Sequence, residues 1–130
     1  MPAKPAKQAG KRVLCVSWLE PLLKRRKEML EAAGLFVTSA YGTKEAERIC
    51  GLDQGFDLVV LGWSIPRPDK IALVQFLRAH CKAPILSIRK HGDPPLREVE
   101  YSIDSDNERE ILVAAAKLAM GMEHTGGASG

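Results

Sequence analysis

Short runs of aliphatic residues alternate with amphipathic segments along this chain. A short run that is apolar on both sides predicts a strand buried on both faces of a sheet. Five such strands are expected, over residues 12–17, 35–40, 57–61, 85–88 and 99–103. Apolar residues at helical spacing predict helices over residues 21–33, 43–50 and 69–80, and a last helix that starts after residue 105.

The expected helix starts follow from the residue types found there. Thr43 and Asp69 are expected to cap their helices, because side-chain oxygens accept hydrogen bonds from the free amide groups of a first turn. The spacing Ser105-x-x-Glu108 matches a capping box before the last helix. The inner face of that helix is then expected to consist of Ile111, Leu112, Ala115 and Leu118.

The segment between the fourth and fifth strands breaks this rhythm. His91-Gly92-Asp93-Pro94-Pro95 disfavours a helix, because proline lacks a backbone donor and restrains the residue before it. We expect a single turn at most, over residues 96–98, so the fourth helix is short or missing. Alternating strands and helices imply a parallel sheet covered on both faces. The predicted fold class is α/β, a doubly wound five-stranded parallel sheet with strand order 2-1-3-4-5.

Length and composition indicate one folded domain. The chain has 130 residues, of which 45% are hydrophobic and 27% charged, as in ordinary globular proteins. No apolar run approaches the length of a membrane span, and the N-terminus lacks the apolar core of a signal peptide, so a cytoplasmic location is the default. The expected organisation is a disordered basic arm at 1–10, a domain at 11–122 and a flexible tail at 123–130.

Charge and reactive side chains argue against several function classes. A net charge of +3 is too small to imply nucleic-acid binding, and the basic run at residues 24–27 is expected to be a solvated helix face. Three widely spaced cysteines fit neither a disulfide framework nor a zinc site, and the three histidines are dispersed. No phosphate-binding loop motif occurs. We therefore expect neither a metal nor a cofactor.

Three parts of the chain together carry a specific pattern. The first is the strand Arg12-Val-Leu-Cys-Val16 and the helix end Glu28-Met-Leu-Glu-Ala-Ala-Gly34 that follows it. The second is Asp57-Leu-Val-Val-Leu61 followed by Ile65-Pro66-x-x-Asp69, and the third is Pro84-Ile-Leu-Ser-Ile88. Over about residues 12–120 the chain resembles the receiver domain of bacterial response regulators. The resemblance implies a flavodoxin-like fold and a place in two-component or phosphorelay signal transduction.

The working positions of that family have all changed in this chain. Receivers generally carry an acidic pair after the first strand that holds magnesium, and these positions are here Ser17 and Trp18. The aspartate that accepts the phosphoryl group corresponds to Gly62. The threonine or serine after the fourth strand and the lysine after the fifth correspond to Arg89 and Asp104.

These changes remove the groups that the family's chemistry requires. Phosphoryl transfer to a carboxylate needs a nucleophilic oxygen and a cation that neutralises the phosphoryl charge, and magnesium prefers carboxylate ligands. The resemblance therefore implies a degenerate receiver, or pseudo-receiver, with no phosphoacceptor, no metal and no enzymatic activity. Asp57 lies at the opposite end of its strand, and Asp69 is expected to be a helix cap. Asp104 is expected to form an ion pair with Arg89.

Two tryptophans follow strands at the degenerate site. Trp18 and Trp63 either fill the vacated pocket as core residues or form an exposed aromatic surface for a partner. We favour filling, and alanine substitutions distinguish the two interpretations.

The expected function is a signalling module that acts by phosphorylation-independent protein–protein interaction. Its partner is another signalling protein or a second copy of the chain, with neither membrane nor nucleic acid involved. In receivers the surface around the fourth helix, fifth strand and fifth helix commonly carries partner contacts, and Pro94-Pro95 would reshape it. The alternatives are a working response regulator receiver with a displaced acceptor and a small flavodoxin-like ligand-binding protein.

Overall fold

The computed structural model describes residues 10–122 of the chain. The predicted tail at 123–130, and the predicted basic arm at 1–10 apart from Gly10, lie outside the described residues.

The described residues form five parallel strands and four α-helices that alternate along the chain. In chain order these are β1 (Arg12–Ser17), α2 (Glu20–Ala32), β2 (Phe36–Tyr41), α3 (Thr43–Leu52), β3 (Leu58–Leu61), α4 (Arg67–His80), β4 (Ile85–Arg89), β5 (Tyr101–Asp104), the 3-10 turn η1 (Ser105–Asn107) and α5 (Glu108–Ala119). The strand order is β2-β1-β3-β4-β5, which confirms the predicted topology.

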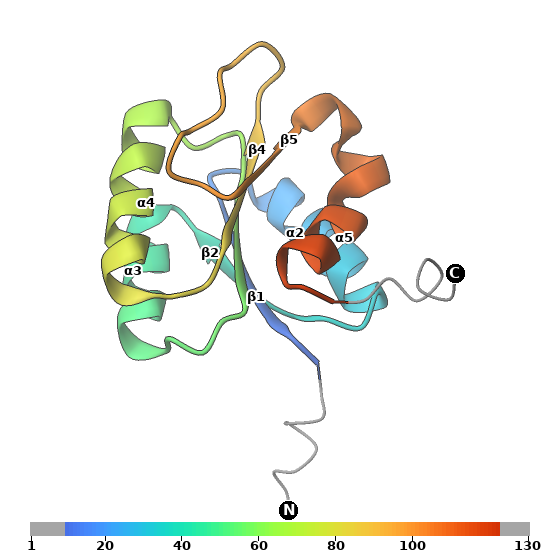
Figure 1. Cartoon of the computed structure of the whole chain (residues 1–130), viewed down its shortest axis with the longest axis horizontal. Helices are drawn as coiled ribbons and strands as arrows, with labels where there is room; N and C mark the ends of the chain where they lie inside the picture. Colours follow the sequence, from blue (N-terminus) through green and yellow to red (C-terminus); the bar gives the residue numbers. More distant parts are fainter. Residues whose placement is uncertain (1–9, 123–130) are drawn as a thin grey trace, which may run out of the picture.

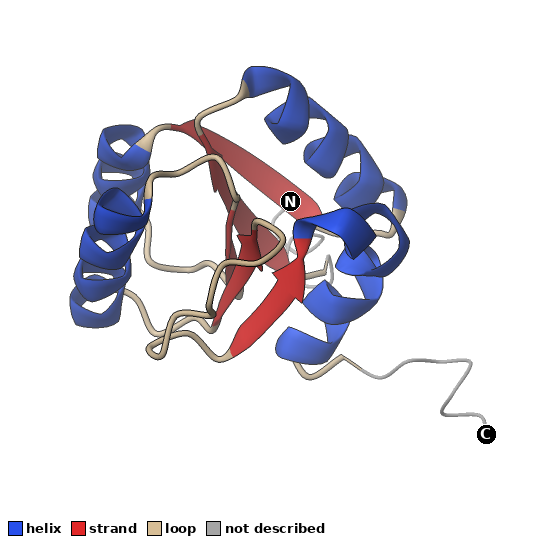
Figure 2. Cartoon of the chain, turned by 90° about the horizontal axis from the view of Figure 1, so that it is seen from above, coloured by secondary structure: helices blue, strands red, loops and turns tan. Residues whose placement is uncertain are grey.

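Helices cover both faces of the sheet (Figure 1). The view from above shows α3 and α4 on one side and α2 and α5 on the other (Figure 2). Leu14 and Val59 face the α3 and α4 side, whereas the neighbouring residues Val13 and Val60 face the α2 and α5 side. This alternation explains why the central strand β3 is apolar at every position, because consecutive side chains point to opposite faces and both faces are buried.

Local chemistry at the helix starts differs from the sequence expectation. α3 has Gly42 at its N-cap position and α4 has Pro66 there, so Thr43 and Asp69 lie inside their first turns and do not cap through their side chains. The capping box at residue 105 is also wrong, because η1 precedes α5 and Asp104 accepts from the Asp106 amide instead. The inner face of α5 is formed by Glu108, Leu112, Ala116 and Ala119, and Leu118 is 66% exposed.

The connection between β4 and β5 contains no helix, as the prolines predict. It runs over one end of the sheet as a long loop, drawn in yellow to orange in Figure 1. Three contacts hold it: Leu96 is buried in the core on the α4 side, the Arg78 guanidinium donates to the Glu98 carbonyl, and the Glu100 carboxylate accepts from the Ile85 amide at 2.9 Å. The loop is therefore anchored to both α4 and β4 without a helix of its own.

None of the described helices is both long and apolar enough to cross a membrane. All three cysteines are free and buried, as expected for Cys15. Burial raises the pKa of the Cys15 thiol to about 12, so it packs as a small apolar group at neutral pH.

Candidate functional site at the carboxyl edge of the sheet

The carboxyl ends of β1 and β3 lie next to each other, and this edge is where open α/β sheets place their functional groups. The Gly62 amide donates to the Val16 carbonyl at 2.9 Å, so Ser17 and Gly62 are neighbours across the two strands. Ser17 is fully buried, and its hydroxyl lies 2.9 Å from the Ser64 hydroxyl. Ser64 also accepts from the Trp18 amide. These bonds link the ends of the two strands. None of the residues Ser17, Trp18 and Gly62 carries a carboxylate.

A guanidinium group occupies the space above Gly62. A Cβ atom built on Gly62 would lie 2.6 Å from Arg26 Nη1 and 3.2 Å from the Val16 carbonyl oxygen. A real side chain at this position would require the guanidinium to move, so Gly62 is the residue that admits Arg26. Arg26 comes from α2 and is completely buried, so the prediction of a solvated face at residues 24–27 is wrong at this position.

The charge of Arg26 is balanced by a carboxylate from a distant part of the sequence. Arg26 Nε and Nη2 donate to the two carboxylate oxygens of Glu108, at 2.5 and 3.0 Å. Glu108 is the first residue of α5 and is also buried. Its carboxylate therefore pairs with an arginine 82 residues earlier in the chain and is not available for the predicted capping box. Two-pronged pairing of this kind is the geometry that makes arginine suited to buried ion pairs.

One donor of this arginine is left over. Arg26 Nη1 is buried and has no hydrogen-bond partner among the described residues. It is the atom that approaches Gly62. A buried donor without a partner destabilises the folded state. The hydrogen bonds to Glu108 and the packing around the guanidinium therefore have to offset this cost.

The tryptophans do not fill the space above Gly62, so the favoured interpretation is wrong. Trp18 is 38% exposed, and its indole nitrogen lies beside the Gly42 turn, 3.9 Å from the place of a Cβ on that glycine. Trp63 is half-buried against the core on the α2 and α5 side. The Lys90 ammonium lies 5.5 Å from the centre of the Trp63 ring. Arg26, paired with Glu108, lies above Gly62 instead.

Arg89 and Asp104 are neighbours in register but do not form the predicted ion pair. The Arg89 guanidinium donates to the Ser102 hydroxyl at 2.9 Å and to the Asp93 carbonyl at 3.3 Å. The Asp104 carboxylate accepts from the Asp106 amide at 2.8 Å and lies 3.3 Å from His91 Nδ1. The Asp106 amide, together with the His91 side chain, lowers the pKa of Asp104. Arg89 and Asp104 each form hydrogen bonds with other groups, and these bonds explain why the two side chains do not pair with each other.

His91, Asp104 and Asp106 form an exposed cluster that the sequence spacing did not predict. One potential ligand atom from each of the three side chains lies within 4.8 Å of the others. His91 lies in the loop after β4, whereas Asp104 and Asp106 lie at and after the end of β5. The three residues therefore form no local sequence motif that would predict the cluster.

Lys70 is a further residue at this edge that sequence reasoning did not single out. It lies in the first half of α4 on the face turned toward the sheet, and only 6% of it is exposed. Its ammonium donates to the Ile88 carbonyl at 3.0 Å, near the carboxyl end of β4. Burial, followed by the charge of Arg26, lowers the pKa of Lys70 to about 8. Two buried cations, Arg26 and Lys70, therefore lie at the carboxyl edge of the sheet.

Asp57 lies at the opposite edge, as predicted. Its carboxylate accepts from the Arg12 amide at 2.8 Å, where β1 begins. It cannot reach the carboxyl edge of β3 and plays a structural part at the other end of the sheet.

The fold is that of response regulator receiver domains. The chain resembles the receiver domain of the Francisella response regulator 1452, with a TM-score of 0.76 and 18% identity over 86% of this chain and 98% of that one. It also resembles a two-component response regulator from Clostridium difficile (TM-score 0.75, 19% identity, 86% and 97% covered). A third similar structure is a receiver protein from Burkholderia phymatum (TM-score 0.74, 16% identity, 88% and 98% covered). No family model and no curated protein matches the sequence. At these identities the likeness establishes the fold, and any function has to be argued from this chain's own residues.

Proposed function

We propose that this protein is a receiver-like signalling module of a two-component or phosphorelay type of system that acts through protein–protein contacts without being phosphorylated. The observation that supports it most is the Arg26–Glu108 pair above Gly62. A cation already neutralised by a buried carboxylate occupies the place from which a phosphoacceptor would act. The proposal includes the absence of enzymatic activity.

The residues at this edge do not fit a magnesium ion. Ser17, Trp18 and Gly62 provide no carboxylate, and both serine hydroxyls are engaged with each other. The guanidinium of Arg26 and the ammonium of Lys70 add positive charge where a cation would have to bind. Magnesium requires oxygen ligands and is repelled by such a site.

Exposed apolar side chains beside this edge support a role in protein contacts. Trp18, Leu19 and Tyr41 are 38%, 41% and 57% exposed, and Trp18 and Tyr41 line the same surface hollow. Tryptophan and tyrosine are enriched among residues that dominate binding energy. The proposed partner is another signalling protein or a second copy of this chain. The proposal keeps the cytoplasmic location expected from the sequence.

Phosphorylation is tested directly by intact-mass measurement after incubation with a small acyl phosphate and magnesium. We expect no phosphoryl adduct, because neither the nucleophile nor the metal ligands are present. A receiver domain with an intact acceptor, treated in parallel, shows that the donor is active. A stable adduct on the wild-type protein that disappears in Asp69→Asn or Asp104→Asn would establish a displaced acceptor and contradict the proposal.

A further inference from the structure

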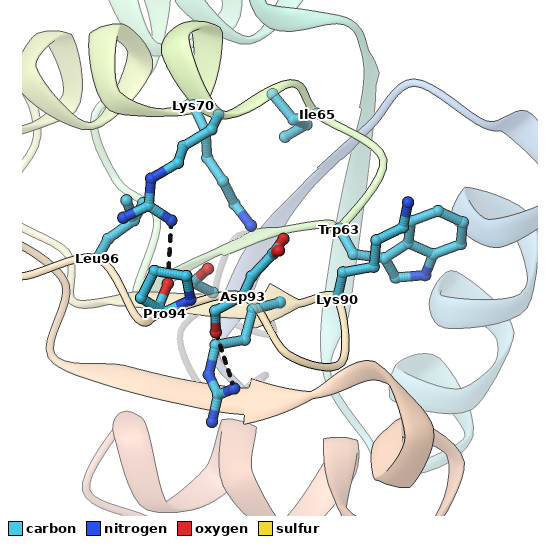
Figure 3. Close-up of a pocket in the computed structure, with 10 residues that line it drawn as sticks. Trp63, Ile65, Lys70, Lys90, Asp93, Pro94 and Leu96 are labelled. Carbon is cyan, nitrogen blue, oxygen red and sulfur yellow. Dashed lines mark hydrogen bonds between the residues drawn. The ribbon is translucent and has the colours of Figure 1, made fainter.

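A basic pocket opens between the start of α4 and the loop after β4 (Figure 3). Its charged lining consists of Arg67, Lys70, Arg89, Lys90 and Asp93. Four cations thus surround a single carboxylate. Apolar walls are provided by Trp63, Ile65 and Leu96, so the charges act in a partly water-excluded space.

Lys70 is the most buried charge of this pocket. Asp93 is the one carboxylate among the lining residues and acts on Lys70 only through its charge, without a salt bridge, and the one hydrogen bond of the ammonium among residues 10–122 goes to the Ile88 carbonyl. An ammonium group has three donors, so two of them remain for a ligand. A buried cation without a paired charge is costly, and an anion that enters the pocket would remove this cost.

The outer cations are held in place by the loop. Arg67 Nη1 donates to the Pro94 carbonyl at 3.0 Å, and the Arg89 guanidinium donates to the Asp93 carbonyl and to Ser102. Figure 3 shows two of these bonds, from Arg67 to Pro94 and from Arg89 to Asp93, as dashed lines. Each guanidinium has five N–H donors, so both keep donors that can turn to a ligand. The cations are therefore positioned before any ligand arrives, which lowers the entropy cost of binding.

The size of the pocket restricts what can enter. Its volume is about 30 Å³, far below the several hundred Å³ of a site for a drug-sized molecule. One or two oxygen atoms of a tetrahedral oxyanion fit such a space while the rest of the anion faces the outer cations. Arginine and lysine together are the residues that recognise phosphate groups.

We propose that this basic pocket binds a small phosphate-class oxyanion without forming a covalent bond, with Lys70 as the inner ligand and Arg67 and Arg89 as outer ligands. The inference does not depend on the proposed signalling function. It requires no nucleophile and no metal ion, and a failure to bind an anion would leave the argument against phosphorylation unchanged.

A substitution of Asp93 distinguishes anion binding from a purely structural role of the charges in this pocket. Its carboxylate points toward Lys70 in Figure 3 and raises the lysine's pKa, although burial and the charges of Arg26 and Arg67 outweigh it. If the pocket binds an anion, Asp93 repels it, and Asp93→Asn tightens binding. If Asp93 serves only as a distant counter-charge for Lys70, Asp93→Asn destabilises the fold and does not improve anion binding.

The test is calorimetric titration of the full chain with inorganic phosphate at pH 7 and constant ionic strength, with chloride as the reference anion. Saturable phosphate binding is expected in the wild type, weakened about tenfold or more in Lys70→Met and in Arg67→Gln, and tightened in Asp93→Asn. Arg67 is exposed, so its variant keeps the test independent of how the Lys70 variant folds. Lys82→Met, at an exposed lysine beyond the end of α4, is the matched control and should bind like the wild type.

Absence of saturable binding in the wild type, or equal binding by wild type, Lys70→Met and Arg67→Gln, would overturn the proposal. Titration with phenyl phosphate identifies the source of the anion. Equal binding of both ligands supports recognition of a phosphate group on a larger molecule, and binding of inorganic phosphate alone supports the free ion.

Discussion

Arg26 shows how one side chain defines this site at the residue scale. Its guanidinium lies above Gly62 at the carboxyl edge of the sheet, the absence of a side chain on Gly62 leaves room for it, and Glu108 neutralises its charge. Removing two charges from water is expensive, and their mutual attraction offsets that cost only when both partners are present. Each of the two buried charges therefore needs the other to offset the cost of its burial.

Breaking the pair on one side should destabilise the protein. We expect Glu108→Gln to lower the free energy of unfolding by about 3 kcal/mol, because it leaves the Arg26 charge buried without compensation. The double variant Arg26→Met with Glu108→Leu should recover most of this loss, since apolar groups of similar volume need no counter-charge. Urea unfolding followed by circular dichroism measures both values.

The exposed pair Lys24–Glu28 on the same helix is the matched control, and Glu28→Gln should leave the unfolding free energy unchanged. An equal effect of Glu28→Gln and Glu108→Gln would show that burial of the Arg26 pair does not matter.

At the scale of elements, the segment between β4 and β5 distinguishes this chain from a regular doubly wound fold. Pro94 and Pro95 prevent a helix, and the loop is held instead by one apolar anchor and by side-chain bonds to its backbone. Because the loop also carries Asp93 and borders the basic pocket, its anchoring determines where the pocket's charges lie.

The anchor is Leu96, and its removal should be costly. Leu96 is 7% exposed and packs in the core on the α4 side. Leu96→Ala should lower the free energy of unfolding by about 2–3 kcal/mol, near the low end for core leucines because a loop can relax around the cavity.

Leu118→Ala provides the comparison within the same chain. Leu118 was predicted to face inward but is 66% exposed, so its truncation should change the unfolding free energy by about 0.5 kcal/mol or less. A Leu96→Ala variant as stable as Leu118→Ala would show that the loop is not anchored in the core.

At the scale of the whole molecule, positive charge is concentrated at one edge of the sheet. Arg26 from α2, Arg67 and Lys70 from α4, and Arg89 from β4 meet there, although a net charge of +3 gives no hint of such a focus. A parallel sheet gathers the ends of distant strands at one edge, so residues that are scattered along the chain act on one small volume.

This concentration should be visible in the pH dependence of stability. The pKa of Lys70 is about 8 in the fold, against an ordinary value of 10.5. Burial and the positive charges of Arg26 and Arg67 lower this pKa more than the negative charge of Asp93 raises it. Two further cations, Arg89 and Lys90, line the same pocket. Between these two pH values the unfolded chain binds more protons than the folded one, so stability should rise with pH in this window.

The measurement is the difference in unfolding free energy between wild type and Lys70→Met from pH 7 to 10.5. Subtraction removes the titration of other groups. We expect the wild type to gain stability relative to Lys70→Met above about pH 8, and a difference that stays constant over the range would contradict the lowered pKa.

Local patterns were sufficient for the fold. The aliphatic runs predicted all five strands, their alternation with helices predicted the order β2-β1-β3-β4-β5, and the prolines predicted the missing helix. These features depend on neighbouring residues and on general rules of chain connection, so they can be predicted from the sequence. The correspondence of Ser17, Trp18 and Gly62 to the acidic positions of receivers stays a prediction from the sequence.

The residues that occupy the site could not be predicted from local sequence patterns. Arg26 looked like one member of a solvated basic run, and Glu108 looked like part of a capping box, because each side chain was judged by its neighbours in the sequence. The ion pair joins residues 82 positions apart, and it exists because α2 and α5 cover the same face of the sheet. Lys70 and the loop after β4 meet for the same reason at the carboxyl edge. The order of strands and helices followed from the residue pattern, whereas the buried charges at the carboxyl edge depend on contacts between distant segments that form only in the folded chain.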